Sequence, residues 1–349
     1  MRAIGKFLAI LAFLPALPCG AQQAPESTEP EAGFMTLEND YWSQTDYHYT
    51  NGIQFSSRSK QDTRGKLTRS LTNGACRLFG CGDARFLFTQ HNLGQLMYTP
   101  GHITVAEPQP FDRPWAGLLY TERQWLFLAP DGEALTTLTA QAGVTGKLSL
   151  AEHTQKFFHE LFDDRMPQGW DNQIGNTLAV LVSAERRSAW PLLSGDLAGG
   201  VRLHTAGHWR LAAGSIMSYA AGGVSVTIGK NLPPVAPMPP GIVNRFRDAE
   251  TSCLWRWLQC TLVLGAEVRR VGWNLFLQGR PGKDDPSVEP RRWVGDLSAG
   301  LRLDFPHTRG RDHGPVFLQL RATRRSAEFH SSVHVPSHTI GSLTLGTDL

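Results

Sequence analysis

The chain has 349 residues, with 34 Lys and Arg against 31 Asp and Glu and a formal net charge of +3 at pH 7. So small a positive excess argues against nucleic acid as a partner and only permits an anionic ligand. No stretch approaches the roughly 18 consecutive apolar residues of a membrane helix, so a helical membrane protein is excluded. The length is ordinary for a single barrel domain.

The N-terminus has the pattern of an export signal. Arg2 and Lys6 precede a short apolar run at residues 7–17, and Cys19-Gly20-Ala21 follows with small residues. This order predicts a signal peptide over residues 1–21. Residues 22–32 are rich in Pro, Glu and Ser and are expected to form a flexible leader, which leaves residues 33–349 as the folded domain.

Four cysteines remain after the signal peptide, as two close pairs. Cys76 and Cys81 form the first pair, and Cys253 and Cys260 form the second. In an exported chain this spacing predicts two local disulfides. Zinc is the alternative, but neither pair has the C-x-x-C spacing of a zinc site.

Beyond the leader, apolar and polar residues alternate with a period of two in many segments, which is typical of strands with one apolar face. A soluble sandwich and a transmembrane barrel both have this pattern. The long segments, the signal peptide and the Trp and Tyr residues near segment ends favour an antiparallel transmembrane β-barrel with aromatic girdles. The girdle residues are expected to be Trp115, Tyr120, Trp125, Trp190, Trp209, Trp273 and Trp293. About twelve strands are expected, at residues 34–40, 49–57, 85–97, 115–129, 134–146, 175–188, 195–206, 212–228, 260–278, 291–305, 315–326 and 338–348.

An even strand number puts both termini on the periplasmic side. The connections at 41–48, 98–114 and 147–174 must then emerge together at the extracellular rim. The third connection contains a predicted helix at 151–162, which has no Gly or Pro. Gln155 and His159 are four residues apart and should share one face of this helix.

The stretch 37–52 is rich in oxygen donors, namely Asn39, Asp40, Thr45, Asp46, Thr50 and Asn51. Such a mixture suits a hard cation such as calcium. The same residue types also dominate ordinary loops, so this stretch alone does not decide between the two.

Several motifs occur in a fixed order. Asn39-Asp40 is followed by Tyr49-Thr50-Asn51-Gly52, Tyr98-Thr99-Pro100, Asp112-Arg113-Pro114-Trp115-Ala116-Gly117, the Gln155 and His159 pair, and Gln168-Gly169-Trp170. In this order the chain resembles the outer-membrane lipid A 3′-O-deacylase family over essentially its whole mature length. The resemblance implies a twelve-stranded outer-membrane barrel that hydrolyses the 3′-linked acyl-oxyacyl ester of lipid A and depends on calcium.

The resemblance also assigns roles to residues. It implies His159 as the general base, with Gln155 beside it on the helix, and Asn39 and Thr50 as polar groups around the metal and the substrate. Asp40 is the expected calcium ligand from the first loop. Asp164 is the expected second ligand, with Asp163 as the alternative because the correspondence there shifts by one residue.

These roles are chemically coherent. Ester hydrolysis needs a base that deprotonates water and a positive group that stabilises the oxyanion, for which an imidazole and a calcium ion are suited. No H-E-x-x-H and no G-x-S-x-G motif is present. A Thr50 nucleophile paired with His159 is an open alternative to water activation.

Two other functions are weighed against the deacylase. A passive, porin-like barrel would not need a His-bearing helix beside an acidic loop, and another outer-membrane hydrolase, such as a phospholipase or a protease, could use the same residues. The expected partners are lipid A or lipopolysaccharide and the surrounding outer-membrane lipids, with no nucleic acid, and the protein is expected to be a monomer.

Overall fold

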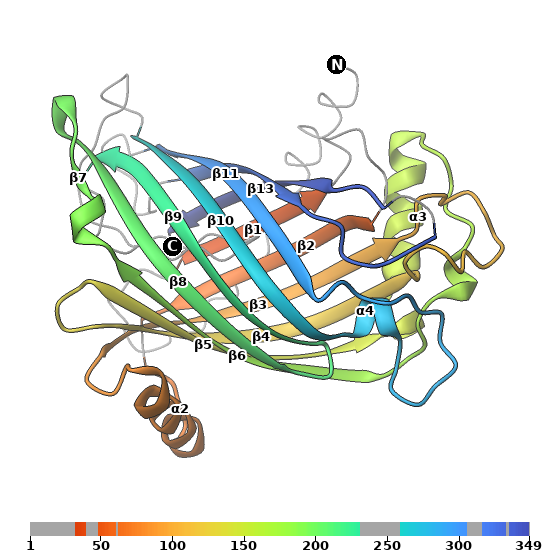
Figure 1. Ribbon diagram of the computed structural model, residues 1–349, viewed down its shortest axis with the longest axis horizontal. Helices are drawn as coiled ribbons and strands as arrows, with labels where there is room; N and C mark the ends of the chain where they lie inside the picture. The colour runs from red at the N-terminus through yellow and green to blue at the C-terminus, as the bar shows by residue number, and fades with distance from the viewer. Residues whose placement is uncertain are drawn as a thin grey trace, which may run out of the picture.

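The computed structural model describes residues 32–39, 48–60, 62–230, 259–305, 316–332 and 335–348. Most of these residues lie in long antiparallel strands that form the wall of a barrel (Figure 1). The barrel strands are β1 (Ala32–Asn39), β2 (His48–Ser59), β3 (Arg85–Thr99), β4 (Ala116–Leu128), β5 (Ala134–Thr145), β6 (Leu178–Ala189), β8 (Val201–Gly214), β9 (Met217–Lys230), β10 (Gln259–Asn274), β11 (Trp293–Phe305), β12 (Val316–Arg325) and β13 (His338–Asp348).

Strands that are neighbours in the chain pair with each other, and two further pairings complete the ring. β1 pairs with β13, and β6 pairs with β8. The short β7 (Gly195–Asp196) pairs only with β8 and is not part of the wall. The prediction of a twelve-stranded antiparallel barrel is therefore confirmed.

Two neighbouring predicted strands have the wrong bounds. The strand expected at 212–228 is β9, which begins only at Met217 because β8 continues to Gly214. Residues 195–206 were expected to form a strand, but the chain there forms β7 and a short turn before β8 begins at Val201. Gly199 and Gly200 both have positive φ angles, of 71° and 74°. A backbone with these φ angles cannot continue a strand, although apolar and polar side chains alternate around the two glycines.

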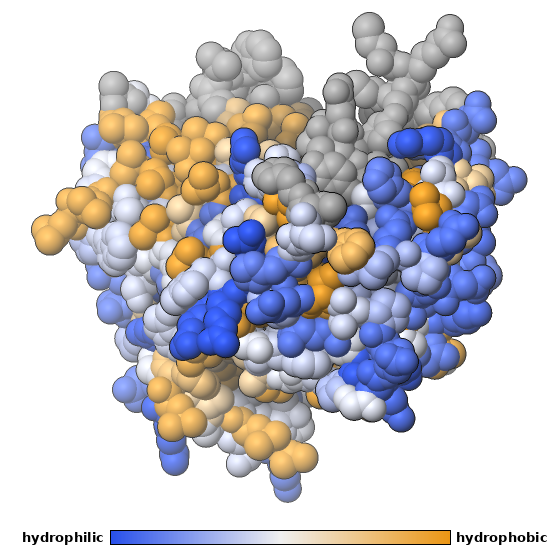
Figure 2. All heavy atoms as spheres, turned by 45° about the vertical axis from the view of Figure 1, so that its right-hand side comes forward, coloured by the Kyte–Doolittle hydropathy of each residue, from blue (hydrophilic) through white to orange (hydrophobic). Residues whose placement is uncertain are grey.

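The two faces of the wall differ as expected for a membrane barrel. Interior positions carry paired charges: Glu185 forms ion pairs with Arg187 and Arg210, and Asp296 forms them with Arg269 and Arg325. Outward positions carry exposed apolar side chains, among them Phe55, Leu93, Leu178, Val180, Val182, Leu264 and Leu297. Figure 2 shows apolar side chains gathered over part of the wall, whereas the end that is turned forward is mostly hydrophilic.

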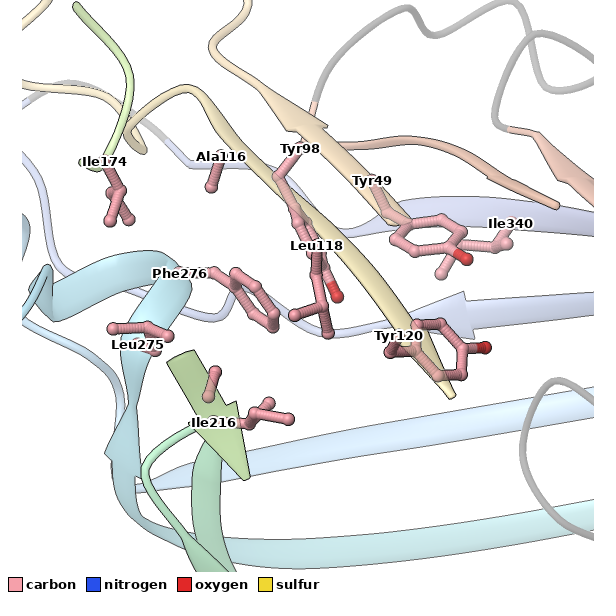
Figure 3. Close-up of a cluster of buried hydrophobic side chains, with 11 residues drawn as sticks. Tyr49, Tyr98, Ala116, Leu118, Tyr120, Ile174, Ile216, Leu275, Phe276 and Ile340 are labelled. Atoms are coloured by element: carbon pink, nitrogen blue, oxygen red, sulfur yellow. The ribbon is translucent and has the colours of Figure 1, made fainter. Parts of the chain in front are cut away.

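Apolar side chains fill the barrel mouth at one end (Figure 3). Tyr98 of β3 stacks on Phe276 of the short helix α4 (Leu275–Gln278), with ring centroids 4.5 Å apart. β3 and β10, which leads into α4, are six positions apart in the ring of twelve, so this contact crosses the barrel. The other members of the cluster are Tyr49, Ala116, Leu118, Tyr120, Ile174, Ala179, Ile216, Leu275 and Ile340.

Two longer helices lie toward opposite ends of the barrel (Figure 1). α3 (Ala151–Phe162) matches the predicted helix, whereas α2 (Lys66–Phe79) was not predicted. None of the described helices is long and apolar enough to cross a membrane.

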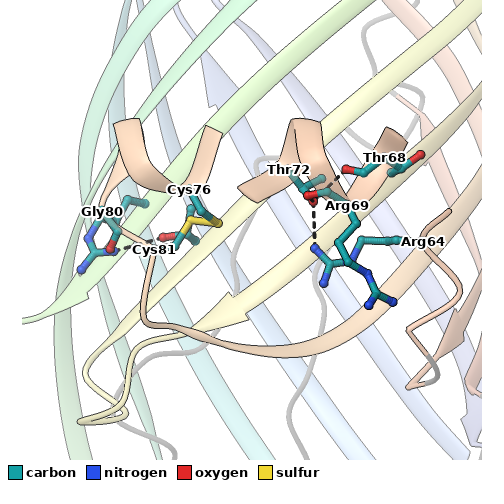
Figure 4. Close-up of a disulfide and its surroundings, with 9 residues drawn as sticks. Arg64, Thr68, Arg69, Thr72, Cys76, Gly80 and Cys81 are labelled. Carbon is teal, nitrogen blue, oxygen red and sulfur yellow. Dashed lines mark hydrogen bonds between the residues drawn. A yellow bond between two sulfur atoms is a disulfide. The ribbon is translucent and has the colours of Figure 1, made fainter. Parts of the chain in front are cut away.

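The predicted disulfide between Cys76 and Cys81 is confirmed at the end of α2 (Figure 4). The second predicted bridge involves Cys253, which lies outside the described residues. The predicted signal peptide, at residues 1–21, also lies outside them.

The girdle interpretation is wrong for two aromatic residues. Trp115 is only 3% exposed and packs on Trp170, and Tyr120 is only 5% exposed. Tyr120 faces the interior, where its hydroxyl donates a hydrogen bond to Gln54 over 2.7 Å. Trp190 and Trp293 are 40% and 61% exposed, as residues of an interfacial girdle should be.

Candidate active site

A row of cross-strand neighbours, with two asparagines among them, crosses the outward face of the wall at the end where α3 lies. Asn39 pairs with Asn51, Asn51 pairs with Met97, and Met97 pairs with Gly117, on the consecutive strands β1 to β4. Cross-strand partners share one face of a sheet. Phe55, four residues from Asn51 along β2, is 51% exposed, which identifies this face as the outer one. Asn39 and Asn51 therefore lie on the outside of the barrel and not in its lumen.

A β-bulge at Thr50 produces this orientation. The pairing register shifts between Tyr49 and Asn51, so the two residues face opposite sides of the wall. Tyr49 points inward and donates a hydrogen bond to Glu38 over 2.6 Å. A side chain at Gly52 would collide with the Tyr49 hydroxyl, so glycine is needed there.

Thr50, in the bulge, and Asn51, in the row, add polar groups to this part of the wall. The Thr50 hydroxyl lies 2.5 Å from that of Thr99, and both residues are buried. The buried amide oxygen of Asn51 has no hydrogen-bond partner among the described residues. An oxygen in that state is available to a ligand.

α3 packs against the same outer face. A Cβ added at Gly117 would lie 2.2 Å from the Ser149 hydroxyl and 2.4 Å from the Cβ of Ala151, which begins α3. Gln95 of β3 donates a hydrogen bond to the Ser149 carbonyl over 2.6 Å. The glycine thus allows the helix to approach the backbone of β4 closely.

Two tryptophans hold the following loop against α3. Trp115 and Trp170 have ring centroids 5.0 Å apart and form a buried cluster with Met97, Ile103 and Ala151. The Trp170 indole donates a hydrogen bond to Gln155 Oε1 over 2.7 Å. Gln155 is 2% exposed, and its amide nitrogen has no partner among the described residues. A buried amide donor is therefore oriented and unused.

His159 lies one turn further along α3 and is half-buried. Its Nδ1 is 2.6 Å from the backbone carbonyl of Arg165. A carbonyl can only accept, so Nδ1 carries a proton, and in the neutral ring the lone pair is then on Nε2. The arrangement leaves Nε2 as the nitrogen that can take a proton.

The turn after α3 sets this geometry. Asp163 ends the helix with a left-handed φ of 58°, and the Asp164 amide donates to the His159 carbonyl over 2.9 Å. The Asp164 carboxylate accepts a hydrogen bond from the Arg165 amide over 2.7 Å. Asp164 therefore helps to position the carbonyl that orients His159.

A buried ion pair supports the rim beside the site. The Arg113 guanidinium contacts Glu328 at 3.3 Å and lies over the Tyr98 ring. Burial tends to raise the pKa of Glu328, but Arg325 and Arg113 outweigh it and lower this pKa to about 2. The carboxylate is therefore charged near neutral pH, and it ties the loop after β12 to the loop before β4.

Of the predicted residues, Gln155 and His159 lie on α3, Asn39 lies in the adjoining row on the outer face, and Thr50 lies in the β-bulge beside that row. Asp40 lies outside the described residues. In the described ranges there is no group of three or more His, Cys, Asp or Glu side chains that could hold a metal. The sequence analysis did not identify Glu328 or Met97. No local motif marks Glu328 as different from other loop carboxylates, or Met97 as different from other apolar strand residues.

Comparisons with known proteins agree with the motif order. A family model described as "Outer membrane protein LpxR" matches residues 7–349. The structure is similar to LpxR from Salmonella typhimurium, with a TM-score of 0.69 and 16% identity, covering 91% of this chain and 100% of that chain. The β domain of the Bordetella autotransporter Brka is less similar, with a TM-score of 0.42 and 9% identity over 92% of this chain and 98% of that chain.

No match was found among curated proteins. The family match nevertheless spans nearly the whole chain, and the solved LpxR structure shares its barrel fold. This chain therefore belongs to the LpxR family and is a protein of the outer membrane.

Proposed function

We propose that this protein hydrolyses the 3′-linked acyl-oxyacyl ester of lipid A in the outer leaflet of the outer membrane. The observation that carries the proposal is the position of the site: the row from Asn39 to Gly117 and the helix with Gln155 and His159 lie on the outward wall. Both chain ends described, Ala32 and Asp348, pair at the opposite rim, so the α3 end faces the cell exterior. An ester embedded in the outer leaflet can reach such a site from the membrane.

In the proposed mechanism, His159 Nε2 takes a proton from a water molecule while the water oxygen attacks the ester carbonyl carbon. The carbonyl π bond breaks and its electron pair moves onto the oxygen. The unused amide N–H of Gln155 is the proposed donor to that oxyanion. When the oxyanion collapses, the bond to the alcohol oxygen breaks, and the His159 proton passes to the leaving alkoxide.

Calcium binding is part of the same proposal, with Asp40 and Asp164 as the carboxylate ligands. Support comes from the unpartnered amide oxygen of Asn51, which faces Asn39 across the strand pair. Calcium takes six to eight oxygen ligands, and amide oxygens are among those it accepts. When bound, the ion would polarise the ester carbonyl as a Lewis acid.

The alternatives are less well supported. A passive pore needs an open mouth, whereas the stack of Tyr98 on Phe276 crosses the barrel there. A Thr50 nucleophile needs a base, whereas the hydroxyl of Thr50 is paired with that of Thr99, which is not basic. A phospholipase could use the same residues and is separated from the deacylase only by experiment.

The test is mass spectrometry of lipids from cells that express the chain. Loss of a 3′ acyl-oxyacyl unit from lipid A supports the proposal, intact lipid A with cleaved phospholipids supports a phospholipase, and unchanged lipids support a passive barrel. His159→Asn should lower the rate by roughly 10²–10⁴-fold, as is typical for removal of one general base. His153→Asn, at an exposed position of the same helix, is the matched control and should stay active. Heat-modifiable gel migration verifies that both variants fold.

A further inference from the structure

Helix α2 lies outside the barrel wall. Strand pairing places Phe127, Leu138 and Ala184 on the outward face, because their neighbours Leu126, Thr137 and Glu185 belong to the interior rows. These three outward residues are nevertheless at most 5% exposed, since Cys76 and Cys81 at the end of α2 pack on them. Phe79 of α2 also contacts Trp209 of β8, with ring centroids 5.7 Å apart.

The helix ends where the apolar outer surface ends. Along β6 the outward residues are Leu178, Val180, Val182 and Ala184, and then Arg186, the first charged one. Arg186 donates a hydrogen bond over 2.6 Å to the carbonyl of Gly80, the residue that caps the C-terminus of α2. α2 is thus held at the edge of the apolar belt on the rim opposite α3, which is the periplasmic edge.

One face of α2 is apolar and uncovered by the described residues. Leu67, Leu71 and Leu78 are 74%, 65% and 82% exposed. They recur at spacings of four and seven residues and therefore share a face, opposite the buried Thr72 and Cys76. This leucine face points away from the wall. The exposed basic residues Lys66 and Arg77 flank it.

The helix is fastened firmly to the wall (Figure 4). Arg64 donates a hydrogen bond to the Thr72 hydroxyl over 2.8 Å, and its guanidinium lies over the rings of Phe86 and Phe127. The Cys76–Cys81 disulfide closes the turn at the other end. A helix anchored at both ends holds its leucine face in one direction.

We propose that α2 is an interfacial helix that inserts its leucine face into the periplasmic leaflet, among glycerophospholipids, with Lys66 and Arg77 at the phosphate level. α2 lies beside the edge of the apolar belt, which is the part of an outer-membrane barrel that faces lipid. The flanking basic side chains can reach phosphates while their aliphatic stems stay among apolar groups. Leucines on one side and cations beside them are the pattern of helices that lie in a membrane interface.

The test is spin labelling of the full-length barrel in bilayers of phosphatidylethanolamine and phosphatidylglycerol. Leu67→Cys, Leu71→Cys and Leu78→Cys carry the label, one at a time, and Asn73→Cys is the matched control, since it is exposed on another face of α2. The unsubstituted protein, treated in the same way, reports any background labelling. The ratio of collisions with oxygen to collisions with a water-soluble nickel complex should be higher at all three leucine positions than at residue 73, because oxygen concentrates in the apolar part of the bilayer and the nickel complex in water.

Three results would overturn the proposal. Equal ratios at the leucine positions and residue 73 would mean that water covers the leucine face. If the labels at the leucine positions are shielded from both oxygen and the nickel complex, in detergent as well as in bilayers, a segment of the chain covers the leucine face. Dipolar coupling between labels on different molecules would mean that a second copy does.

The charge requirement has its own test. Replacing phosphatidylglycerol by phosphatidylcholine should make the label at residue 71 more accessible to the nickel complex, because the anionic headgroups are lost. The double variant Lys66→Gln and Arg77→Gln should remove that difference between the two lipids. A label at residue 71 that responds equally to both lipids while Lys66 and Arg77 are present would refute a preference of these two residues for anionic headgroups.

Discussion

Gly117→Val should displace α3 from the barrel wall. The added Cβ would lie 2.2 Å from the Ser149 hydroxyl and 2.4 Å from the Cβ of Ala151. Carbon atoms pack at about 3.5–4.0 Å, so the start of the helix must move by about 1 Å or more. Overpacking of this kind costs about 1–3 kcal/mol. The hydrogen bond from Gln95 to Ser149, now 2.6 Å long, would stretch beyond its normal range.

The displacement should reach the proposed catalytic groups, because Gln155 and His159 lie on the rigid helix that begins at this contact. A shift of about 1 Å in such groups can lower a rate by about 10²-fold. Hydrogen exchange in bilayer discs measures the displacement directly: the amides of residues 146–162 should exchange faster, while the barrel strands keep their protection. Lipid A deacylation, measured in parallel, should fall by about the same 10²-fold.

Gly295→Val is the matched control. Gly295 is also a strand glycine, but the nearest atoms to its added Cβ would lie 3.9 Å away, which is an ordinary van der Waals distance, so the Cβ meets no clash there. This variant should keep both the exchange pattern and the activity. If Gly117→Val also kept native protection over residues 146–162, the close approach of α3 to β4 would not be what holds the helix, and the reasoning would fail.

Three further predictions concern stability. Trp170→Phe removes the donor to Gln155 and leaves a buried acceptor unsatisfied, which should destabilise the protein by about 1–3 kcal/mol in thermal unfolding. Replacing both Cys76 and Cys81 by Ser should cost about 2 kcal/mol and release α2 to protease, with the activity unchanged. Glu328 has its pKa lowered from 4.5 to about 2, so its charged form contributes stability above pH 4.5 that is lost as the pH falls toward 2. That loss amounts to about 3 kcal/mol in denaturant titrations. Glu328→Gln should reduce the acid-induced loss of stability by this amount, and an unchanged acid titration in this variant would contradict the assignment.

The strand pattern was predictable because lipid and lumen impose opposite polarities on alternate residues. Along β6 the exposed Leu178, Val180 and Val182 alternate with less exposed positions, and the sequence reveals this directly. The pattern could not reveal α2. Gly74 lowers helix propensity, and the helix owes its stability to the wall residue Phe127 and to the disulfide, which are tertiary features.

The aromatic residues show a second limit. Trp190 and Trp293 are exposed and fit a girdle, whereas Trp115 is covered by Trp170 from a loop far along the chain. Sequence position near a strand end is the same in all three cases. Whether a loop folds back over the outer wall depends on contacts such as the one at Gly117, which no periodicity encodes.

The polar residues of the site were predictable as types but not in their direction. Strict alternation would put Tyr49 and Asn51 on the same face, because they are two residues apart. The bulge at Thr50 breaks that alternation, so Tyr49 turns inward to Glu38 and Asn51 turns outward. Gly52 leaves the space that the Tyr49 hydroxyl occupies. The short sequence Tyr49-Thr50-Asn51-Gly52 thus reverses the face of one strand, and this reversal presents the candidate site to the membrane instead of to a closed lumen.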